Sequence, residues 1–235
     1  MKIAVISDIH GFSLALDRVL ADIGAEPGVA QIVVAGDLCE GGPDPRGVLD
    51  RLMNLGAEVV QGNTDRDLAN GFRTSKGATY TTDQIGPDGI SYLGSLPFDR
   101  RIRPPDGTSP DDDLLVVHAN PVDLDRHIPP DAGDHELQEL IGDTRAAVIA
   151  FGHIHIAYTR QWQDYQLVDV SAVGNPKDGD LRSKWGLFTW DLTAKRWTCQ
   201  LRYVDYPLAE TVEQIRASGM PNPDKVIGAL ERASY

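Results

Sequence analysis

The sequence contains little cysteine and no long apolar run, and each shortage excludes a class of protein. Its two cysteines, Cys39 and Cys199, are far apart and lack CxxC spacing. We therefore predict neither a disulfide framework nor a thiolate metal site, and we expect a reducing, cytoplasmic location. No apolar stretch approaches the roughly 20 residues that cross a bilayer, and the N-terminus lacks the apolar region of a secretory signal. No membrane partner is expected.

Positive charge is also scarce. The sequence has 22 lysines and arginines against 35 aspartates and glutamates, for a net charge of −13. Because nucleic-acid binding depends on basic side chains that displace counterions, this balance disfavours nucleic acid as a partner. An acidic surface also repels a phosphate ester, unless the site carries positive charge of its own. A pair of divalent cations would supply that charge.

Five short apolar runs predict buried strands, because they are rich in β-branched residues and do not alternate with polar residues. They cover residues 3–6, 32–35, 58–60, 114–117 and 147–151. Helical patterns separate the first three runs. Ser13 is the expected N-cap of one helix, and Asp44 and Pro45 begin the other. Strands and helices in alternation predict a parallel sheet with crossover helices.

The rest of the chain is less regular. We predict a helix over about 89–96, a hairpin whose tip is the polar stretch 104–113, and a helix around 134–142. Strands that meet at turns, and therefore pair antiparallel, are predicted over 156–206. A helical tail covers about 208–235. With no repeat and no linker, the whole chain (1–235) is predicted to form a single α/β domain.

Each of the five runs is followed by a side chain that can bind a metal ion. In chain order these are Asp8, His10, Asp37, Asn63, His118, His153 and His155. We expect them to gather in space, because ligands of α/β sheets bind at the carboxyl ends of the strands. The mixed oxygen and nitrogen donors suit manganese first, with iron, zinc or nickel as alternatives. Seven donors suffice for two divalent ions if one carboxylate bridges them.

Each pair of residues taken alone is ordinary, since Gly-Asp or Asp-x-His is more often a turn than a metal site. The ordered set of motifs SDIHG, GDL, GNTD, VVHANP and GHIH is much more specific. Over about residues 1–177 it resembles the calcineurin-like metallophosphoesterases, and most of all their small bacterial branch with phosphodiesterase-like and diadenosine-tetraphosphatase-like members.

The resemblance implies a fold and a site. The fold is an α/β four-layer architecture, with two β-sheets packed face to face and flanked by helices. One metal ion would take Asp8, His10, Asp37 and His155, and the other would take Asp37, Asn63, His118 and His153. Asp37 would bridge the two ions, and Asp37, Asn63 and His118 form the catalytic group. The expected substrate is a small phosphorylated molecule, attacked in line by a hydroxide held between the ions.

One position departs from the common family pattern. Many members carry histidine after the asparagine of the third motif, where this sequence has Thr64. A threonine hydroxyl cannot donate a proton near neutral pH. We therefore expect leaving groups that need little protonation, such as aryl esters, phosphodiesters or the anhydride links of dinucleotide polyphosphates.

Three further residues have less specific signals. Asp65 could orient a ligand histidine or cap the following segment. Arg66 and Lys177 are the candidate contacts for a substrate phosphate. The alternatives to the main hypothesis are a protein Ser/Thr phosphatase or general phosphomonoesterase and, in another class, a metal-dependent binding or scaffold protein with weak catalysis. An assay of the metal-loaded protein with a chromogenic diester and a phosphopeptide separates them.

Overall fold

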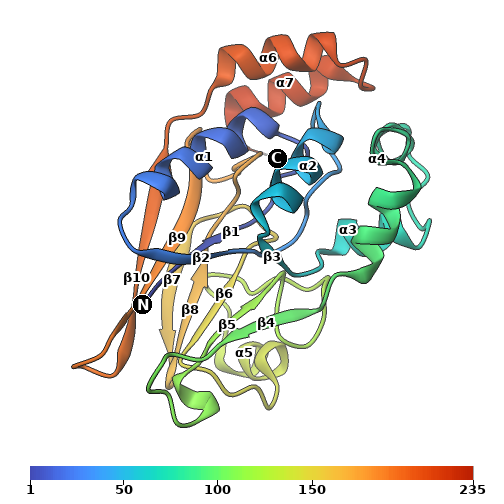
Figure 1. Cartoon of the computed structure of the whole chain (residues 1–235). Coiled ribbons are helices and arrows are strands. Elements are labelled where there is room, and N and C mark those ends of the chain that lie inside the picture. Colours follow the sequence, from blue (N-terminus) through green and yellow to red (C-terminus); the bar gives the residue numbers. More distant parts are fainter. Residues whose placement is uncertain (235) are drawn as a thin grey trace.

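Two five-stranded β-sheets pack face to face in the computed structural model, which describes residues 1–234 (Figure 1). The first sheet has the order β10-β9-β1-β2-β3. Its strands are β1 (Lys2–Ile6), β2 (Val29–Val34), β3 (Glu58–Val59), β9 (Ser183–Asp191) and β10 (Arg196–Val204). Strands β1, β2 and β3 run parallel, as the sequence predicted, and β9 and β10 add an antiparallel pair beside β1.

The second sheet has the order β4-β5-β6-β8-β7. It is built from β4 (Asp99–Ile102), β5 (Leu114–Val117), β6 (Val148–Phe151), β7 (Tyr158–Trp162) and β8 (Tyr165–Asp169). The hairpin of β4 and β5 confirms the predicted turn over 104–113, which contains a short 3-10 helix, η1 (Pro110–Asp112). The prediction of antiparallel pairing within 156–206 is confirmed for β7 with β8 and for β9 with β10, and β8 also pairs parallel to β6.

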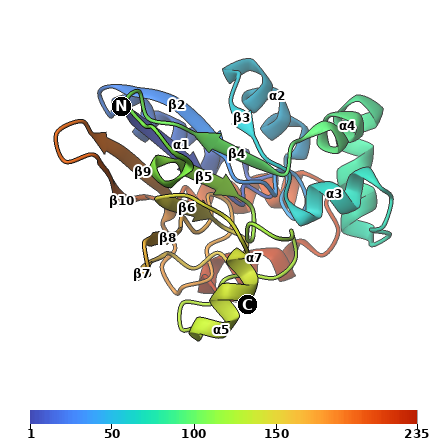
Figure 2. The ribbon, with the colours of Figure 1, turned by 90° about the horizontal axis from the view of Figure 1, so that it is seen from below.

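Helices cover both outer faces of the two sheets (Figures 1 and 2). One apolar core packs the first sheet against α1 (Ser13–Ala25), α2 (Pro45–Leu55), α4 (Lys76–Ser95), α6 (Leu208–Ala217) and α7 (Pro223–Arg232). Another packs the second sheet against α5 (Asp134–Ile141). Between the sheets lies a third core, which includes Val5, Val33, Val116, Phe188 and Trp197. This arrangement confirms the four-layer fold, which buried apolar area stabilises.

Local sequence determines where the crossover helix α2 begins and ends, and it does so less clearly for α1. Asp44 caps α2 by accepting a hydrogen bond from the Gly47 N–H, and Pro45 is the first helical residue. Gly56 ends α2 with a left-handed conformation that glycine adopts without strain. Ser13, however, is not a cap. It is the first residue of α1, and the preceding Phe12 makes no side-chain capping bond.

The segment after β3 contains more helix than the sequence indicated. The short α3 (Asn63–Ala69) precedes α4, which begins well before the predicted residue 89 and bends at Gly86, just ahead of Pro87. The tail forms α6 and α7 as predicted, although residue 235 lies outside the described residues. Within residues 1–234, no helix has the length and apolarity to span a membrane. The single-domain assignment stays a prediction.

Candidate metal centre

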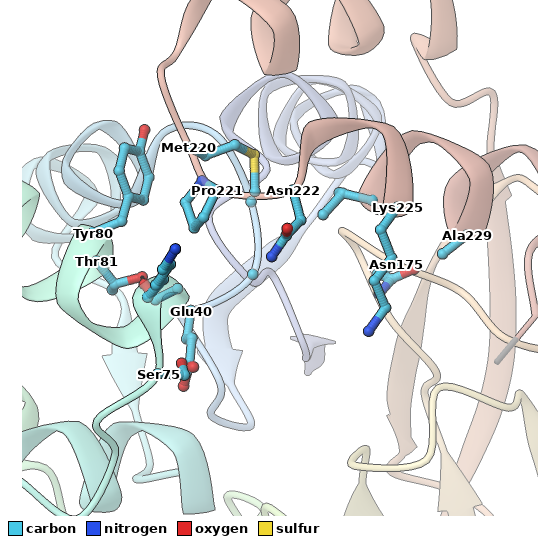
Figure 3. Close-up of a pocket in the computed structure, with 15 residues that line it drawn as sticks. Glu40, Ser75, Tyr80, Thr81, Asn175, Met220, Pro221, Asn222, Lys225 and Ala229 are labelled. Carbon is cyan, nitrogen blue, oxygen red and sulfur yellow. Dashed lines mark hydrogen bonds between the residues drawn. The ribbon is translucent and has the colours of Figure 1, made fainter.

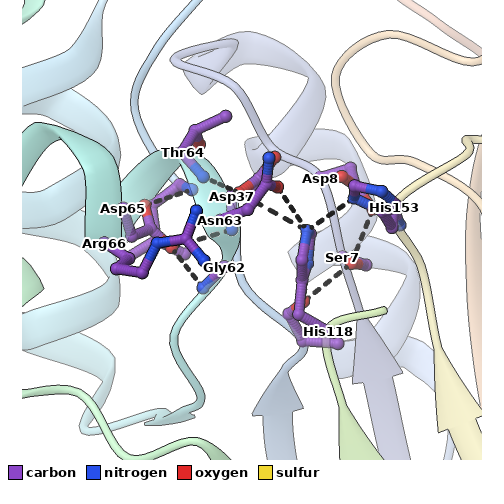
Figure 4. A network of polar contacts seen from close by, with 12 residues as sticks. Ser7, Asp8, Asp37, Gly62, Asn63, Thr64, Asp65, Arg66, His118 and His153 are labelled. Atoms are coloured by element: carbon purple, nitrogen blue, oxygen red, sulfur yellow. Dashed lines mark hydrogen bonds and ion pairs between the residues drawn. The ribbon is translucent and has the colours of Figure 1, made fainter. Parts of the chain in front are cut away.

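The seven predicted ligands come together at one end of the sandwich, where the loops after the parallel strands of both sheets meet. Asp8 N donates to the Gly36 carbonyl in the first sheet, and Gly152 N donates to the His118 carbonyl in the second. The two sets of loops are joined by His153 N, which donates to Asp8 Oδ2 at 2.8 Å. Figure 4 shows part of this network.

One group of donors surrounds Asp8 Oδ1. The Nε2 atom of His155 lies 3.1 Å from this oxygen, and Nε2 of His10 lies 3.5 Å from it. The two Nε2 atoms are 3.2 Å apart, and Asp37 Oδ2 is 3.6 Å from that of His10. Asp8, His10 and His155 are therefore close enough together to share one ion.

A second group surrounds Nε2 of His118. This atom is 2.9 Å from Asn63 Oδ1, 3.1 Å from His153 Nδ1 and 3.6 Å from Asp37 Oδ1. Asp37 thus directs Oδ2 toward the first group and Oδ1 toward the second. Asp8, Asp37 and His118 also lie within reach of one ion. All seven side chains named from the sequence are brought together here.

The histidines are oriented by backbone carbonyls behind them. The Nδ1 atoms of His10, His118 and His155 contact the carbonyl oxygens of Glu40 at 2.7 Å, Ala35 at 2.8 Å and Asn175 at 2.5 Å. His153 is reversed, because its Nε2 atom contacts the Asp125 carbonyl at 2.9 Å. A carbonyl oxygen only accepts, so the nitrogen facing it carries the proton. The other nitrogen of each neutral ring then presents a lone pair to the centre.

The backbone is strained at the same positions. Ten non-glycine residues among the described residues have positive φ, and five of them are candidate ligands. These are Asp8 at 52°, His10 at 52°, Asp37 at 57°, His153 at 78° and His155 at 60°. Such conformations persist where surrounding structure enforces them, and they cluster at functional sites.

Glycines before three ligands allow the close packing that the sequence suggested. A Cβ on Gly62 would overlap the Asp37 carboxylate, and a Cβ on Gly152 would overlap Asp8 Oδ2 and Ser7 Oγ. Gly36 has φ of +86°, and a Cβ there would stand 2.6 Å from Gly62 N. The ligand loops can pack against one another only with glycine at these positions.

The electrostatics of the centre favour a cation. Burial alone would raise the pKa of Asp8, but the neighbouring His155 and His10 outweigh burial and hold it well below its usual range. Burial would likewise lower the pKa of His10, yet Asp8 and Asp37 raise it to about 9. The carboxylates also raise the pKa of the buried His118. Positive charge is therefore strongly stabilised between these side chains.

The donor set fits divalent metal ions. Two imidazole lone pairs that face each other at 3.2 Å repel, unless a proton or a cation lies between them. Nitrogens bound to a metal at about 2.0–2.1 Å and separated by roughly 100° stand at about this distance. Asp8 Oδ1 is buried and accepts no hydrogen bond. An ion at this place would satisfy that oxygen and both nitrogens together.

Asp65 stabilises the loops of the centre through hydrogen bonds from backbone N–H groups. Its carboxylate accepts hydrogen bonds from the N–H groups of Asp37 at 2.8 Å, Leu38 at 3.0 Å and Gly62 at 3.0 Å. It therefore caps α3 and ties this helix to the loop of Asp37, and none of its bonds goes to a histidine. Burial, together with the charge of Asp37, raises the pKa of Asp65 to about 6.

The two candidate substrate contacts have different surroundings. Arg66 makes two 2.9 Å hydrogen bonds to Asp125 and two more to Asp67, so it holds the loop that carries the Asp125 carbonyl. Lys177 lines the same cavity as the candidate ligands, and its Nζ donates to the Ser234 carbonyl at 3.1 Å. The substrate role of both residues stays a prediction. His127 and His135 are exposed, in line with their polar sequence context.

Sequence reasoning missed three residues at the centre. Glu40 and Arg73 line the cavity and form an ion pair at 2.9 Å. Ser7 donates to Asp8 Oδ2 at 2.7 Å and so orients this carboxylate. Ser7 lies inside the first motif and Glu40 follows the second closely. Arg73 lies on an irregular segment ten residues after Asn63, where no pattern points to it.

The fold and the site together define an α/β sandwich protein with a candidate metal-binding site at its strand ends. The chain belongs to the calcineurin-like phosphoesterase family, whose family model matches residues 1–157. It is 35% identical over 128 residues to a symmetrical bis(5'-nucleosyl)-tetraphosphatase of Acidovorax sp. (strain JS42), a match covering 51% of this chain and 44% of that protein. The chain thus spans about half the length of the tetraphosphatase relatives that it matches.

Two solved structures share the fold over nearly the whole chain. A metallophosphoesterase from Sphaerobacter thermophilus has a TM-score of 0.78 and 24% identity, with 99% of both chains covered. A hypothetical protein from Pyrococcus horikoshii OT3 has a TM-score of 0.81 and 19% identity, with 97% of both covered. At these identities the likeness confirms the fold alone.

Proposed function

We propose that this protein is a dinuclear-metal hydrolase that cleaves phosphodiesters or the anhydride links of dinucleotide polyphosphates. The observation that carries the proposal is the position of Asp37. Its Oδ2 atom is 3.6 Å from Nε2 of His10, and its Oδ1 atom is 3.6 Å from Nε2 of His118. A carboxylate that faces two groups of donors with its two oxygens has the arrangement of a bridging ligand.

Each of the two groups of donors that the Asp37 oxygens face would hold one ion. One ion would take Asp8, His10, Asp37 and His155, and the other would take Asp37, Asn63, His118 and His153. When bound, such ions lower the pKa of water to supply a nucleophile and withdraw charge from phosphate oxygens. Manganese is our first expectation for these ions. Iron, zinc and nickel are the alternatives, because mixed oxygen and nitrogen donors accept several first-row metals.

Thr64 supports the choice of substrate. Its backbone N–H donates to Asp37 Oδ1 at 3.0 Å, and its buried hydroxyl has no hydrogen-bond partner. Thr64 lines the cavity of the candidate ligands. The position at which many family members carry a proton-donating histidine is therefore beside the centre. A leaving group that carries its own charge, such as a phosphate anion, needs no acid. The tetraphosphatase relatives support the same substrate class.

The test is a metal-reconstituted assay. The protein, stripped of metal, is loaded separately with manganese, iron, nickel or zinc, and its activity is measured on bis(4-nitrophenyl) phosphate and on diadenosine tetraphosphate. We expect no turnover without metal, turnover with at least one ion, and two ions bound per chain. Asp37→Asn should lower both metal affinity and activity by at least about 100-fold, because loss of a residue that only orients a metal ligand already costs 10–100-fold.

The matched control is Asp164→Asn, which removes the same charge from an exposed turn far from the centre. This variant should retain full activity and both ions. Full activity in Asp37→Asn, or turnover that survives complete metal removal, would contradict the proposal.

A further inference from the structure

A pocket of about 420 Å³, within the size range of ligand sites, lies beside the candidate metal centre. Figure 3 shows residues that line this pocket. The start of α4 forms one wall, and the segment that joins α6 to α7 forms another. The pocket shares Glu40, Gly41 and Asn175 with the cavity that the candidate metal ligands line. The two spaces are therefore neighbours with a common rim, and a single elongated molecule can occupy both.

Two lysines of the pocket are left without partners. The sequence contains six lysines, and Lys2, Lys177, Lys184 and Lys195 each contact a carboxylate or carbonyl oxygen. Within residues 1–234, the side-chain ammonium groups of Lys76 and Lys225 have no hydrogen bond or ion pair, and both residues line this pocket. In a chain of net charge −13, two unpaired ammonium groups at one pocket indicate an anionic ligand.

The pocket also has an apolar side suited to a flat group. Tyr80, Met220 and Pro221 lie close together there (Figure 3). The Tyr80 hydroxyl donates to the Pro43 carbonyl at 2.7 Å, so the ring is held in place. Aromatic and thioether side chains pack well against planar rings. On the shared rim, the buried Oδ1 atom of Asn175 has no hydrogen-bond partner.

The one acidic side chain on the shared rim is already neutralised. Glu40 forms its ion pair with Arg73 at 2.9 Å, so its charge does not oppose an anion in the pocket. The residues Met220, Pro221 and Lys225 belong to the helical tail, which lies outside the 1–157 segment that the family model matches. The pocket therefore depends on a segment that lies outside the part of the chain matched by the family model.

We propose that this pocket binds the leaving half of a dinucleotide polyphosphate, with the nucleoside against Tyr80 and Met220 and its phosphates between Lys76 and Lys225. This inference rests on the proposed function, because the phosphorus under attack lies at the metal centre. The oxygen of a water molecule bonds to that phosphorus, and the P–O bond to the leaving phosphate breaks. The electron pair stays on the leaving oxygen, whose charge the lysines stabilise, and the proton passes to solvent.

Activity measurements with the metal-loaded protein give the first test. We expect KM for diadenosine tetraphosphate to rise roughly 10-fold in Lys76→Ala and in Lys225→Ala, and about 100-fold in the double variant. Each substitution would remove one charged hydrogen bond to the substrate, and the loss of such a bond lowers affinity by about this factor. Hydrolysis of bis(4-nitrophenyl) phosphate should be unchanged, because this diester does not reach the pocket. Ala229→Phe, which fills the pocket from α7, should show the same selective loss.

The control is Lys195→Ala, which removes the same charge from the turn between β9 and β10, where Lys195 pairs with Asp106. It should leave both substrates unaffected. Equal loss of both substrates in the pocket variants would show a structural role and overturn the inference. An unchanged KM for the dinucleotide would overturn it equally.

A binding measurement separates this inference from the proposed function. Calorimetry with adenosine diphosphate and the metal-free protein should detect binding that weakens roughly 10-fold in Lys76→Ala and in Lys225→Ala and is unchanged in Lys195→Ala. If the nucleotide binds in this way while no phosphate ester is cleaved with any metal, the proposed function fails and the pocket assignment stands. If the nucleotide does not bind, the pocket assignment fails.

Discussion

Individual residues at this centre adopt backbone conformations that only close packing can maintain. The left-handed φ values of Asp8, Asp37 and His153 each cost free energy, of order 1–3 kcal/mol. Glycines next to them allow the loops to approach closely enough to enforce these conformations. The stability that the strained residues give up is offset elsewhere in the fold, by the three apolar cores.

Gly62→Ala tests this packing. The new Cβ would overlap the Asp37 carboxylate, so we expect metal affinity to fall by at least about 10-fold, comparable to loss of a ligand's supporting contact. Titration of the metal-free variant with manganese measures the effect. Gly24→Ala is the matched control, because a Cβ at Gly24 meets nothing within 4 Å. It lies in α1, where alanine should stabilise the fold by about 0.5–1 kcal/mol. Equal affinities in the two variants would refute the packing argument.

Thr64→His tests whether the missing acid shapes specificity. The new imidazole would stand in the cavity beside Asp37, where it can donate a proton to a leaving oxygen. We expect the ratio of kcat/KM for 4-nitrophenyl phosphate to that for the bis-aryl diester to rise roughly 10-fold or more, as for the addition of a general acid. Thr64→Gln supplies similar bulk without an acid and should not raise the ratio. An unchanged ratio in Thr64→His removes the argument from leaving groups.

At the scale of elements, the loop after β5 sets the orientation of His153. The Asp125 carbonyl contacts Nε2 of His153, and Arg66 fixes the Asp125 carboxylate from α3. Asp123 folds the same loop by accepting hydrogen bonds from the N–H groups of Asp125 and Arg126 and from the Arg126 guanidinium. This loop connects α3, β5 and the fifth motif, although none of its contacts follows from the motifs themselves.

Asp123 gives this loop a dependence on pH. Burial alone would raise the pKa of Asp123, but hydrogen bonds from Arg126 and Asp125 outweigh burial and lower it to about 2. A folded pKa below the unfolded value of about 3.9 stabilises the fold above that value, and this stability is lost as the pH falls through about 2. Because the carboxylate is partly exposed, we expect a contribution below about 1 kcal/mol.

Urea unfolding of the wild type and of Asp123→Asn at several pH values measures this contribution. The variant should be less stable at pH 6, and the difference should narrow between about pH 4 and pH 2. Asp164→Asn, in an exposed turn, should show no such trend. A difference that does not depend on pH would show that the carboxylate's charge is not the cause.

The sequence predicts some elements well, and physical reasons explain where it fails. Ligand residues at strand ends and the capped helix α2 depend on local signals, so they could be found. The assignment of the five apolar runs to two sheets could not, because strands buried on both faces look alike in either sheet. The first half of α4 is rich in threonine and glycine and gives a weak helical pattern. The pocket of Lys76 and Lys225 depends on tertiary contact between α4 and the tail.

At the scale of the whole molecule, the candidate ligands join the two halves of the sandwich. Asp8, His10, Asp37 and Asn63 follow strands of the first sheet, and His118, His153 and His155 follow β5 and β6 of the second. Ions held between them would link the two sheets where carboxylate charge is concentrated. Metal binding is therefore expected to stabilise the entire fold and not only the loops.

Thermal unfolding with and without metal tests this coupling. At a free manganese concentration about 100 times Kd, each bound ion adds about 2.7 kcal/mol to the free energy of unfolding. For a chain of this length, that corresponds to a rise in Tm of about 5–11 °C per ion. Asp37→Asn should lose most of this rise, whereas Asp164→Asn should retain it. Calcium, which prefers oxygen donors alone, should give a much smaller shift at the same concentration. An equal rise with calcium, or none with any transition metal, would mean that the imidazoles do not bind the ions.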